Sequence, residues 1–292
     1  MNQPFPDEAP QAVCATTTAA ERVLARVVRR EEVTPRHFLF AIRAPKIAVQ
    51  AQAGQFLHVL PRAATSSDPF LRRAFSIMKV QGEEVEFLFR VEGRGTRQLA
   101  ATEVGEVFDV LGPLGVPFDV SLFHVKHAHR VPILVGGGIG VPPLVFLART
   151  LVVSEMKPLV LVGARSESEV VGQNEFREMG LEAQISTDDG SLGERGYVTQ
   201  RLDAVLKSLG EQNDAIVYAC GPTPMLRAVA DVAARWNCPC QVSLEENMPC
   251  GIGVCNGCVV AMRGAASDYE RFRRVCVFGP AMWATDVDWE AF

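Results

Sequence analysis

The sequence predicts two domains, one of α+β and one of α/β class, followed by a small C-terminal module. Up to about residue 118 the chain holds short alternating apolar runs separated by turns, a pattern typical of an antiparallel β-barrel. From residue 131 apolar strands alternate with helical segments, which is typical of a parallel sheet covered by helices. The last part is rich in glycine and charge, contains four cysteines and is too short for a hydrophobic core of its own.

These patterns divide the chain into four segments. We expect a flexible tail over residues 1–20, the barrel over 21–122, the sheet domain over 123–246 and the module over 247–292. A chain of 292 residues is long enough for this division.

Charge and composition argue against several classes of protein. The net charge of −5, with only three Trp and three Tyr, argues against a nucleic-acid partner. No apolar stretch is long enough to span a bilayer, and the N-terminus lacks the basic segment and apolar core of a secretion signal. We therefore expect a cytoplasmic protein that does not enter the membrane.

The barrel region contains six expected strands and one short helix. A hairpin is predicted over residues 22–33 and 37–43, because a Thr-Pro turn separates two β-branched or alternating runs. The other strands are expected over residues 54–60, 74–80, 84–92 and 105–115. The helix is expected over residues 96–102.

The sheet domain is expected to alternate strands with helices. The strands are predicted over residues 131–135, 158–165, 182–187, 214–220 and 240–245. The helices are predicted from about residue 141 to 153 and over residues 198–208 and 222–236. Such buried apolar strands are typical of a parallel sheet with helices on its faces.

The four cysteines of the module have the spacing of metal ligands. Cys250, Cys255 and Cys258 follow a C-x4-C-x2-C pattern, and Cys276 comes later, which matches the ligands of a plant-type [2Fe–2S] cluster. The glycines among them let the backbone turn sharply around such a cluster. Because the module is too short for a core of its own, we expect the metal cluster to hold it together. A zinc site remains an alternative, although zinc sites usually show two C-x2-C pairs. Disulfides or free thiols are less favoured, because nothing marks the chain as secreted.

Two short motifs in the barrel region suit a flat, phosphate-bearing ligand. Arg73 can meet a phosphate, Phe75 can pack on a flat ring, and Ser76 can hydrogen-bond a ring nitrogen. Residues 91–96 add a Gly-x-Gly-Thr loop, in which Gly93, Gly95 and Thr96 allow a close approach of the backbone to a phosphate. Taken alone, each motif is more simply explained as an ordinary basic strand or a glycine turn.

Two loops of the sheet domain indicate a nucleotide site. Residues 136–140, GGGIG, join a strand to a helix at the edge where open parallel sheets bind phosphates. The spacing is not the GxGxxG fingerprint, so this loop alone is a weak indication. The loop at residues 218–225 follows another strand, and Cys220 there can lie against a nicotinamide ring or be a small buried apolar residue.

Smaller features leave alternatives open. His124, His127 and His129 form a dense patch that could bind a metal but more simply lies in a solvated linker. Arg165 ends a predicted strand where an arginine can hold an NADP 2′-phosphate, or it can pair with a nearby glutamate.

The order of these motifs resembles the ferredoxin–NADP reductase superfamily. Within it, residues 243–258, SLEENMPCGIGVCNGC, and the later Val-Cys-x-x-Gly-Pro sequence at 275–280 are similar to the electron transfer subunit of class 1B dihydroorotate dehydrogenase. The resemblance covers nearly everything after residue 20.

The resemblance implies a barrel that binds FAD, a parallel-sheet domain that binds a nicotinamide nucleotide, and a [2Fe–2S] module. FAD would be held by Arg73, Phe75 and Ser76, with Gly93, Gly95 and Thr96 at its pyrophosphate. NAD would be held by Gly137, Gly138 and Gly140, with Cys220 as the catalytic residue and Gly221 near the nicotinamide. NADP remains an alternative to NAD.

The implied partner is an FMN-containing catalytic subunit that oxidises dihydroorotate in pyrimidine biosynthesis, in a heterotetramer. Electrons would pass through the [2Fe–2S] cluster and FAD to NAD⁺. Two alternatives stay open: a subunit of an NAD(P)H-ferredoxin transhydrogenase or a hydrogenase reductase, and a non-catalytic redox sensor.

Overall fold

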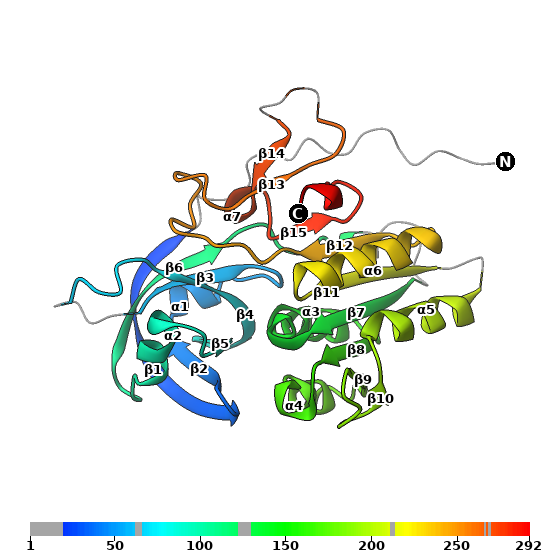
Figure 1. The fold of residues 1–292 in the computed structure, drawn as a ribbon. Coiled ribbons are helices and arrows are strands. Elements are labelled where there is room, and N and C mark those ends of the chain that lie inside the picture. The colour runs from blue at the N-terminus through cyan, green and yellow to red at the C-terminus, as the bar shows by residue number, and fades with distance from the viewer. Residues whose placement is uncertain (1–19, 62–65, 122–129, 211–213, 266, 268–269) are drawn as a thin grey trace.

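The computed structural model describes residues 20–61, 66–121, 130–210, 214–265, 267 and 270–292. The patch formed by His124, His127 and His129 lies outside the described residues. The barrel, the sheet domain and the C-terminal module follow one another along the chain, coloured from blue to red in Figure 1.

The first domain is a closed barrel of six strands in the order β1-β2-β5-β4-β3-β6, with every neighbouring pair antiparallel. Its strands are β1 (Glu21–Thr34), β2 (His37–Arg43), β3 (Phe56–Leu60), β4 (Arg73–Gln81), β5 (Glu84–Arg90) and β6 (Val107–Leu114). Two short helices accompany them, α1 (Pro45–Ala48) and α2 (Arg94–Ala100). Phenylalanine rings from β2, β4, β5 and β6 fill the interior, as period-two alternation on these strands requires.

The second domain is built on a seven-stranded sheet in the order β10-β9-β8-β7-β11-β12-β15. Six of its strands are parallel: β7 (Val131–Gly137), β8 (Leu159–Ala164), β9 (Ala183–Thr187), β10 (Glu194–Arg195), β11 (Ala215–Cys220) and β12 (Cys240–Ser243). The helices are α3 (Pro142–Val153), α4 (Gln173–Glu178), α5 (Val198–Leu209) and α6 (Thr223–Arg235). Among the described residues, the short 3₁₀ turns η2 (Gly138–Gly140) and η3 (Glu167–Glu169) belong to this domain, and η4 (Trp289–Ala291) lies in the C-terminal module.

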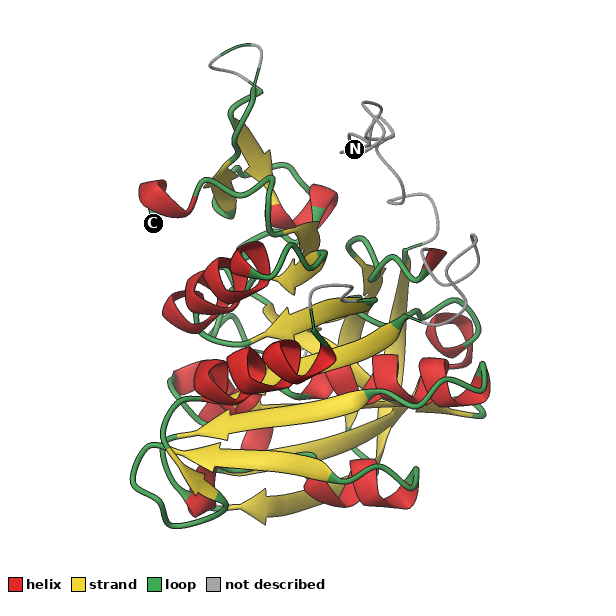
Figure 2. Cartoon of the chain, turned by 90° about the vertical axis from the view of Figure 1, so that its right-hand side faces the viewer, coloured by secondary structure: helices red, strands yellow, loops and turns green. Residues whose placement is uncertain are grey.

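Helices cover both faces of this sheet (Figure 2). On the central strand β7, Ile133 and Val135 pack with the apolar residues of α5 and α6, while Leu134 between them packs with α3 and α4. The alternation explains why β7 is apolar at successive positions. Phe146 of α3 also packs against the barrel core, so the two domains share an apolar contact.

The C-terminal module adds an edge strand to the sheet. It contains a two-stranded ladder of β13 (Val259–Ala261) and β14 (Phe272–Arg274), followed by α7 (Val275–Phe278) and β15 (Ala281–Trp283). Strand β15 pairs antiparallel with β12. Buried side chains of the module, including Val260, Val275 and Trp289, belong to the same apolar cluster as α6. The expectation that a metal cluster would hold this short segment together therefore needs correction, because the sheet core also holds it.

The predicted fold class is confirmed, and the structure adds elements that the sequence did not indicate. The antiparallel strand β15, the two-residue strand β10, the β13–β14 ladder and the short helices α1, α4 and α7 were not expected. Helix α2 begins two residues earlier than predicted. Within the described residues, no helix combines the length and apolar character needed to cross a membrane.

Candidate functional site

The cysteine loop wraps back on itself and points backbone N–H groups at its sulfurs. Gly251 and Gly253 adopt φ values of +70° and +81°, which only glycine takes without strain. The N–H of Cys255 lies 3.5 Å from Cys250 Sγ, and that of Gly257 lies 3.4 Å from Cys255 Sγ. Such N–H groups stabilise thiolates, which are the ligand form of cysteine.

The four cysteines are arranged as two pairs. Burial alone would raise the pKa of Cys250, but loop N–H groups, that of Cys255 first, outweigh it and lower the pKa to about 7. The thiol of Cys276 on α7 hydrogen-bonds to Cys258, which lowers the pKa of Cys258 to about 6 and raises that of Cys276. One thiol of each pair is thus readily ionised near neutral pH.

This donor set fits a cluster of two irons. Each iron of a [2Fe–2S] cluster takes two thiolates, so two separated pairs match its demands. A single zinc ion needs four donors around one point. The contacts of Cys250 with Cys255 and of Cys258 with Cys276 agree with the two-iron cluster that the C-x4-C-x2-C spacing predicts.

A cavity of about 680 Å³ lies where the barrel, the sheet domain and the start of the module meet. From the barrel it is lined by Arg73, Phe75, Ser76 and Thr96, all four of which the sequence singled out. The opposite wall is formed by residues 243–249, the segment that leads into the cysteine loop. Its size and mixed lining suit a large cofactor.

Arg73 and Gly95 bring the two barrel motifs together. A Cβ atom on Gly95 would lie 2.9 Å from Arg73 Nε, so only glycine lets the guanidinium approach α2 this closely. Gly93 is the N-cap of α2, and its N–H donates to Thr96 Oγ1 at 3.1 Å. Thr96 lies in the first turn of the helix, where its hydroxyl oxygen caps the N–H of Gly93. A cation beside a helix N-terminus is a suitable phosphate site.

Phe75 lies at the border between the barrel core and the first cavity. Its ring packs in the barrel interior, with centroids 5.3 Å from Phe87 and 5.2 Å from Phe89, and the residue is only 9% exposed. Most of the ring therefore belongs to the barrel core. Only its remaining edge borders the cavity, where it could meet a flat ligand.

A second cavity of about 500 Å³ lies at the carboxyl edge of the parallel strands. Its walls include Gly137, Gly138, Arg165 and Asp188, as the position of ligands in open α/β sheets requires. Gly140 packs behind this wall, since a Cβ there would lie 2.6 Å from the Cys220 carbonyl oxygen and 2.6 Å from Gly221 Cα.

Cys220 lies between the two cavities but lines neither of them. The residue is 1% exposed, and its Sγ lies 4.0 Å from Oε1 of Glu245, which does line the first cavity. Burial raises the pKa of the Cys220 thiol well above its ordinary value, so the thiol stays protonated. The protein packed around Glu245 likewise raises the pKa of that carboxyl, although the residue faces the open cavity.

Three residues that sequence reasoning missed also contribute to the site. Arg90 and Ile139 line both cavities, and Arg90 forms ion pairs with Glu92 and Glu169. Glu245 lies within the SLEEN stretch that carried the family resemblance, which was the one available sign of its importance. Nothing in the local sequence of Arg90 distinguishes it from other strand arginines.

Comparison with known proteins gives the same assignment. Residues 245–288 match the iron–sulfur cluster binding domain of dihydroorotate dehydrogenase B, and residues 134–231 match the oxidoreductase NAD-binding domain. The chain is 38% identical over 273 residues to the electron transfer subunit of dihydroorotate dehydrogenase B (NAD(+)) from Geobacillus kaustophilus. That match covers 93% of this chain and 96% of the relative. The relative from Desulforamulus reducens is 36% identical, over 91% of this chain and 98% of its own.

Solved structures share the architecture. An NADH-dependent reduced ferredoxin-NADP oxidoreductase, studied for flavin-based electron bifurcation, superposes with a TM-score of 0.76 and 27% identity, covering 92% of this chain and 91% of its own. The ferredoxin reductase of carbazole 1,9a-dioxygenase has a TM-score of 0.62 at 22% identity, over 75% of this chain and 67% of its own, and supports the fold alone. On the close sequence matches, this chain belongs to the family of electron transfer subunits of dihydroorotate dehydrogenase B.

Proposed function

We propose that this protein carries electrons from an FMN-containing catalytic subunit, which oxidises dihydroorotate, through a [2Fe–2S] cluster and FAD to NAD⁺. The observation that carries the proposal is the continuity of the chain between two sites. Met248 and Pro249 line the first cavity, and the next residue, Cys250, is the first cysteine of the loop. A cluster in the loop and a flavin in the cavity would thus be linked by three consecutive residues.

We assign FAD to the first cavity and NAD to the second. FAD in the first cavity would have its pyrophosphate beside Arg73, Gly93, Gly95 and Thr96, and its ring near Phe75 and Ser76. NAD in the second cavity would meet Gly137 and Gly138, with Gly140, Cys220 and Gly221 forming the packed wall behind. Flavin, when bound, joins one-electron and hydride chemistry, and the protein supplies orientation and electrostatics.

The segment boundaries are part of this proposal. We assign FAD binding to residues 21–122, nucleotide binding to 123–246 and the cluster to 247–292, with a tail over 1–20. The partner is proposed to form a heterotetramer with this chain. Thiolate ligands need a reducing compartment, which favours a cytoplasmic location. Arg165 in the second cavity is compatible with the 2′-phosphate of NADP, but we propose NAD because NAD(+) is part of the relatives' name.

A second candidate is suggested by one comparison. The structure with a TM-score of 0.76 is an NADH-dependent reduced ferredoxin-NADP oxidoreductase, and 27% identity over nearly the whole chain extends beyond a shared fold. A transhydrogenase subunit would use the same cofactor sites with a different partner. The higher identity to the dihydroorotate dehydrogenase subunits places this candidate second.

Reconstitution with the catalytic subunit tests the proposal. The two chains are co-purified without oxygen, and NADH formation is followed after addition of dihydroorotate. We expect FAD and cluster in roughly equal amounts on this chain and NADH formation only when both chains are present. A complex that reduces NAD⁺ with reduced ferredoxin and not with dihydroorotate supports the second candidate. Flavin and cluster that never turn over with any nucleotide support a redox sensor.

A further inference from the structure

His58 joins the barrel to the cysteine loop. It lies on β3 within the run Phe56–Leu60, and its side chain is fully buried. Its Nε2 lies 2.9 Å from the carbonyl oxygen of Met248. A carbonyl oxygen only accepts hydrogen bonds, so Nε2 carries the proton and donates it. This bond connects residues that are 190 positions apart in the sequence.

The other side of the ring packs against the loop itself. A Cβ on Gly251 would lie 2.8 Å from His58 Nδ1 and 3.1 Å from Cε1, so the glycine permits direct packing on the ring. Nδ1 is buried and has no hydrogen-bond partner among the described residues. A buried acceptor without a partner costs free energy, and a purely apolar residue would avoid that cost. The position therefore favours a function for the imidazole beyond filling space.

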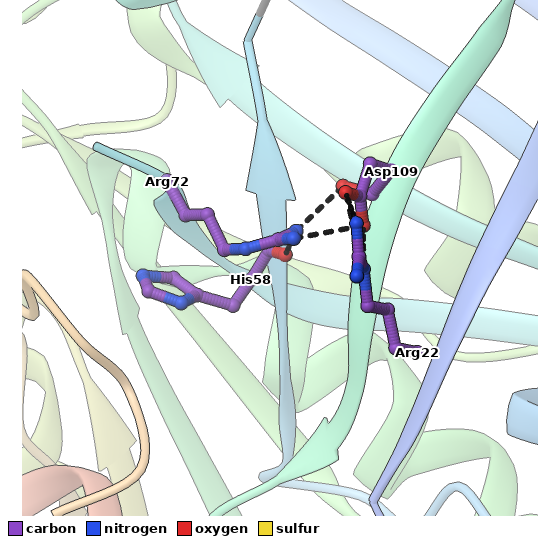
Figure 3. A network of polar contacts seen from close by, with 4 residues as sticks. All are labelled: Arg22, His58, Arg72 and Asp109. Atoms are coloured by element: carbon purple, nitrogen blue, oxygen red, sulfur yellow. Dashed lines mark hydrogen bonds and ion pairs between the residues drawn. The ribbon is translucent and has the colours of Figure 1, made fainter. Parts of the chain in front are cut away.

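The strand around His58 is firmly held. Arg72 Nη1 donates to the carbonyl oxygens of His58, at 3.1 Å, and of Asp109, at 2.7 Å. Arg72 Nη2 also bonds Asp109 Oδ1 at 2.8 Å, and Arg22 binds the same carboxylate. Figure 3 shows this network at the backbone of His58, while the imidazole points away from Asp109 and Arg22. The backbone of His58 is thus fixed in the barrel, while its ring extends toward the cysteine loop.

We propose that His58 is a positioning residue for electron transfer within this chain: its Nε2–H fixes Met248, and with it the link from the first cavity to Cys250, relative to the barrel. The inference rests on the proposed function of the two sites. Electron transfer slows steeply as the gap between two redox centres grows, so loosening this link slows that step. In the isolated holoprotein, the hydride of one NADH would bring two electrons and one proton to the flavin. One electron would pass across the link to the cluster, which accepts a single electron, and the other electron would stay on the flavin together with the proton.

The test uses the holoprotein alone, with NADH as reductant and no partner chain. His58→Leu removes the donor and keeps an apolar side chain. His58→Gln places an amide nitrogen near the position of Nε2, whereas His58→Asn places it near Nδ1. The matched control is His37→Leu, because His37 is a buried barrel histidine, 3% exposed. Among the described residues its ring bonds to Thr34 and Pro35, which belong to its own turn.

Three readouts separate positioning from general destabilisation. Stopped-flow absorbance follows flavin bleaching and cluster reduction separately, electron paramagnetic resonance reports the reduced cluster, and hydrogen exchange reports residues 247–255. In His58→Leu we expect normal flavin bleaching, cluster reduction slower by roughly tenfold to hundredfold, and faster exchange of residues 247–255. His58→Gln should recover most of the rate, and His37→Leu should leave all three readouts unchanged.

Several outcomes would overturn the inference. Cluster reduction at the normal rate in His58→Leu would do so, as would equal slowing in His37→Leu. If His58→Leu fails to fold or to hold the cluster, the amide pair decides: His58→Gln must reduce its cluster roughly tenfold faster than His58→Asn, and equal rates reject the proposal. Failure of dihydroorotate turnover in the reconstituted complex would reject the proposed function and leave these results standing.

Discussion

Gly140 is packed so closely against the loop after β11 that no side chain fits there. A Cβ would lie 2.6 Å from both the Cys220 carbonyl oxygen and Gly221 Cα, and backbone atoms cannot rotate away as a side chain can. We expect Gly140→Ala to lower the free energy of unfolding by about 1–3 kcal/mol through overpacking. Because both loops border the nucleotide cavity, the KM for NADH should rise roughly tenfold or more.

Steady-state kinetics and chemical denaturation check this prediction for Gly140→Ala beside Gly180→Ala. Gly180 has φ +72° and open space around its Cβ position, so that variant costs only backbone strain, about 1 kcal/mol. An unchanged KM for NADH in Gly140→Ala, or an equal rise in Gly180→Ala, would show that the close packing does not shape the nucleotide site.

His58 predicts an acid-sensitive contribution to stability. Burial, aided by Arg72 and Arg73, lowers its pKa from 6.5 to about 4 despite the bond to Met248. Between these values the unfolded chain binds a proton that the folded chain does not, so stability present above pH 6.5 is lost as pH falls toward 4. At about pH 5 the loss amounts to about 2 kcal/mol. Urea denaturation measures the free energy of unfolding at about pH 7.5 and at about pH 5. The decrease between these two pH values should be about 2 kcal/mol smaller in His58→Leu than in the unchanged protein. The same pH dependence in both proteins would contradict it.

Single residues were predictable only where a motif constrained them. The spacing of the four cysteines and the glycines of both loops was visible in the sequence, because metal ligands and close backbone approach demand particular residue types. Phe75 and His58 were not predictable in the same way. An aromatic or a histidine in an apolar strand suits a core and a ligand site equally well, and only the fold shows which neighbours it meets.

At the scale of elements, strand β15 changes the nature of the module. It extends the sheet through β12, and Trp289 behind it is 4% exposed and donates from Nε1 to the Ala284 carbonyl oxygen at 2.9 Å. The module therefore has two supports, the sheet core for residues 275–289 and the metal cluster for residues 250–258. We therefore expect residues 250–258 to lose their structure when the cluster is removed, while the edge of the sheet stays folded.

Removing the cluster with a chelator under reducing conditions tests this division. We expect residues 250–258 to exchange amide hydrogens more than roughly tenfold faster, since their structure depends on the ligands. Residues 281–283 should keep their protection, because their ladder bonds to β12 remain. Hydrogen exchange resolved by peptide measures both regions in one sample. Equal loss of protection would mean that the cluster alone holds the module, as the sequence had suggested.

Long apolar elements were predictable and short long-range ones were not. The strands of the barrel and the parallel strands of the sheet followed from alternation and from apolar runs bounded by glycine. Strand β15 has three residues, and its partner β12 lies about forty positions earlier, so no local periodicity announces the pairing. The same reason explains why the two-residue β10 was missed.

At the scale of the whole molecule, three sites adjoin one another. Arg90 and Ile139 line both cavities, and residues 248–249 connect the first cavity to the cysteine loop. The family resemblance, carried by the order of the motifs, predicted which cofactor each segment would hold. It could not predict that the sites meet, because that depends on how barrel, sheet and module pack.

This arrangement predicts that the cluster can be removed while FAD stays bound. Cys250→Ser should remove the cluster, because a serine hydroxyl stays protonated at neutral pH and is a poor ligand for iron. FAD should remain, since Arg73, Ser76 and Thr96 lie on the barrel and not on the loop.

NADH oxidation by ferricyanide, which takes electrons from flavin, should therefore continue near the normal rate in Cys250→Ser. Dihydroorotate-dependent NAD⁺ reduction in the complex should fall to background. Iron and flavin analysis accompanies both assays. Cys238→Ser serves as control because that buried thiol bonds to backbone groups of Pro239 and Val217 and lines neither cavity. Loss of FAD together with the cluster would show that the loop is required to build the cavity wall at Met248 and Pro249, and that the two sites fold as one unit.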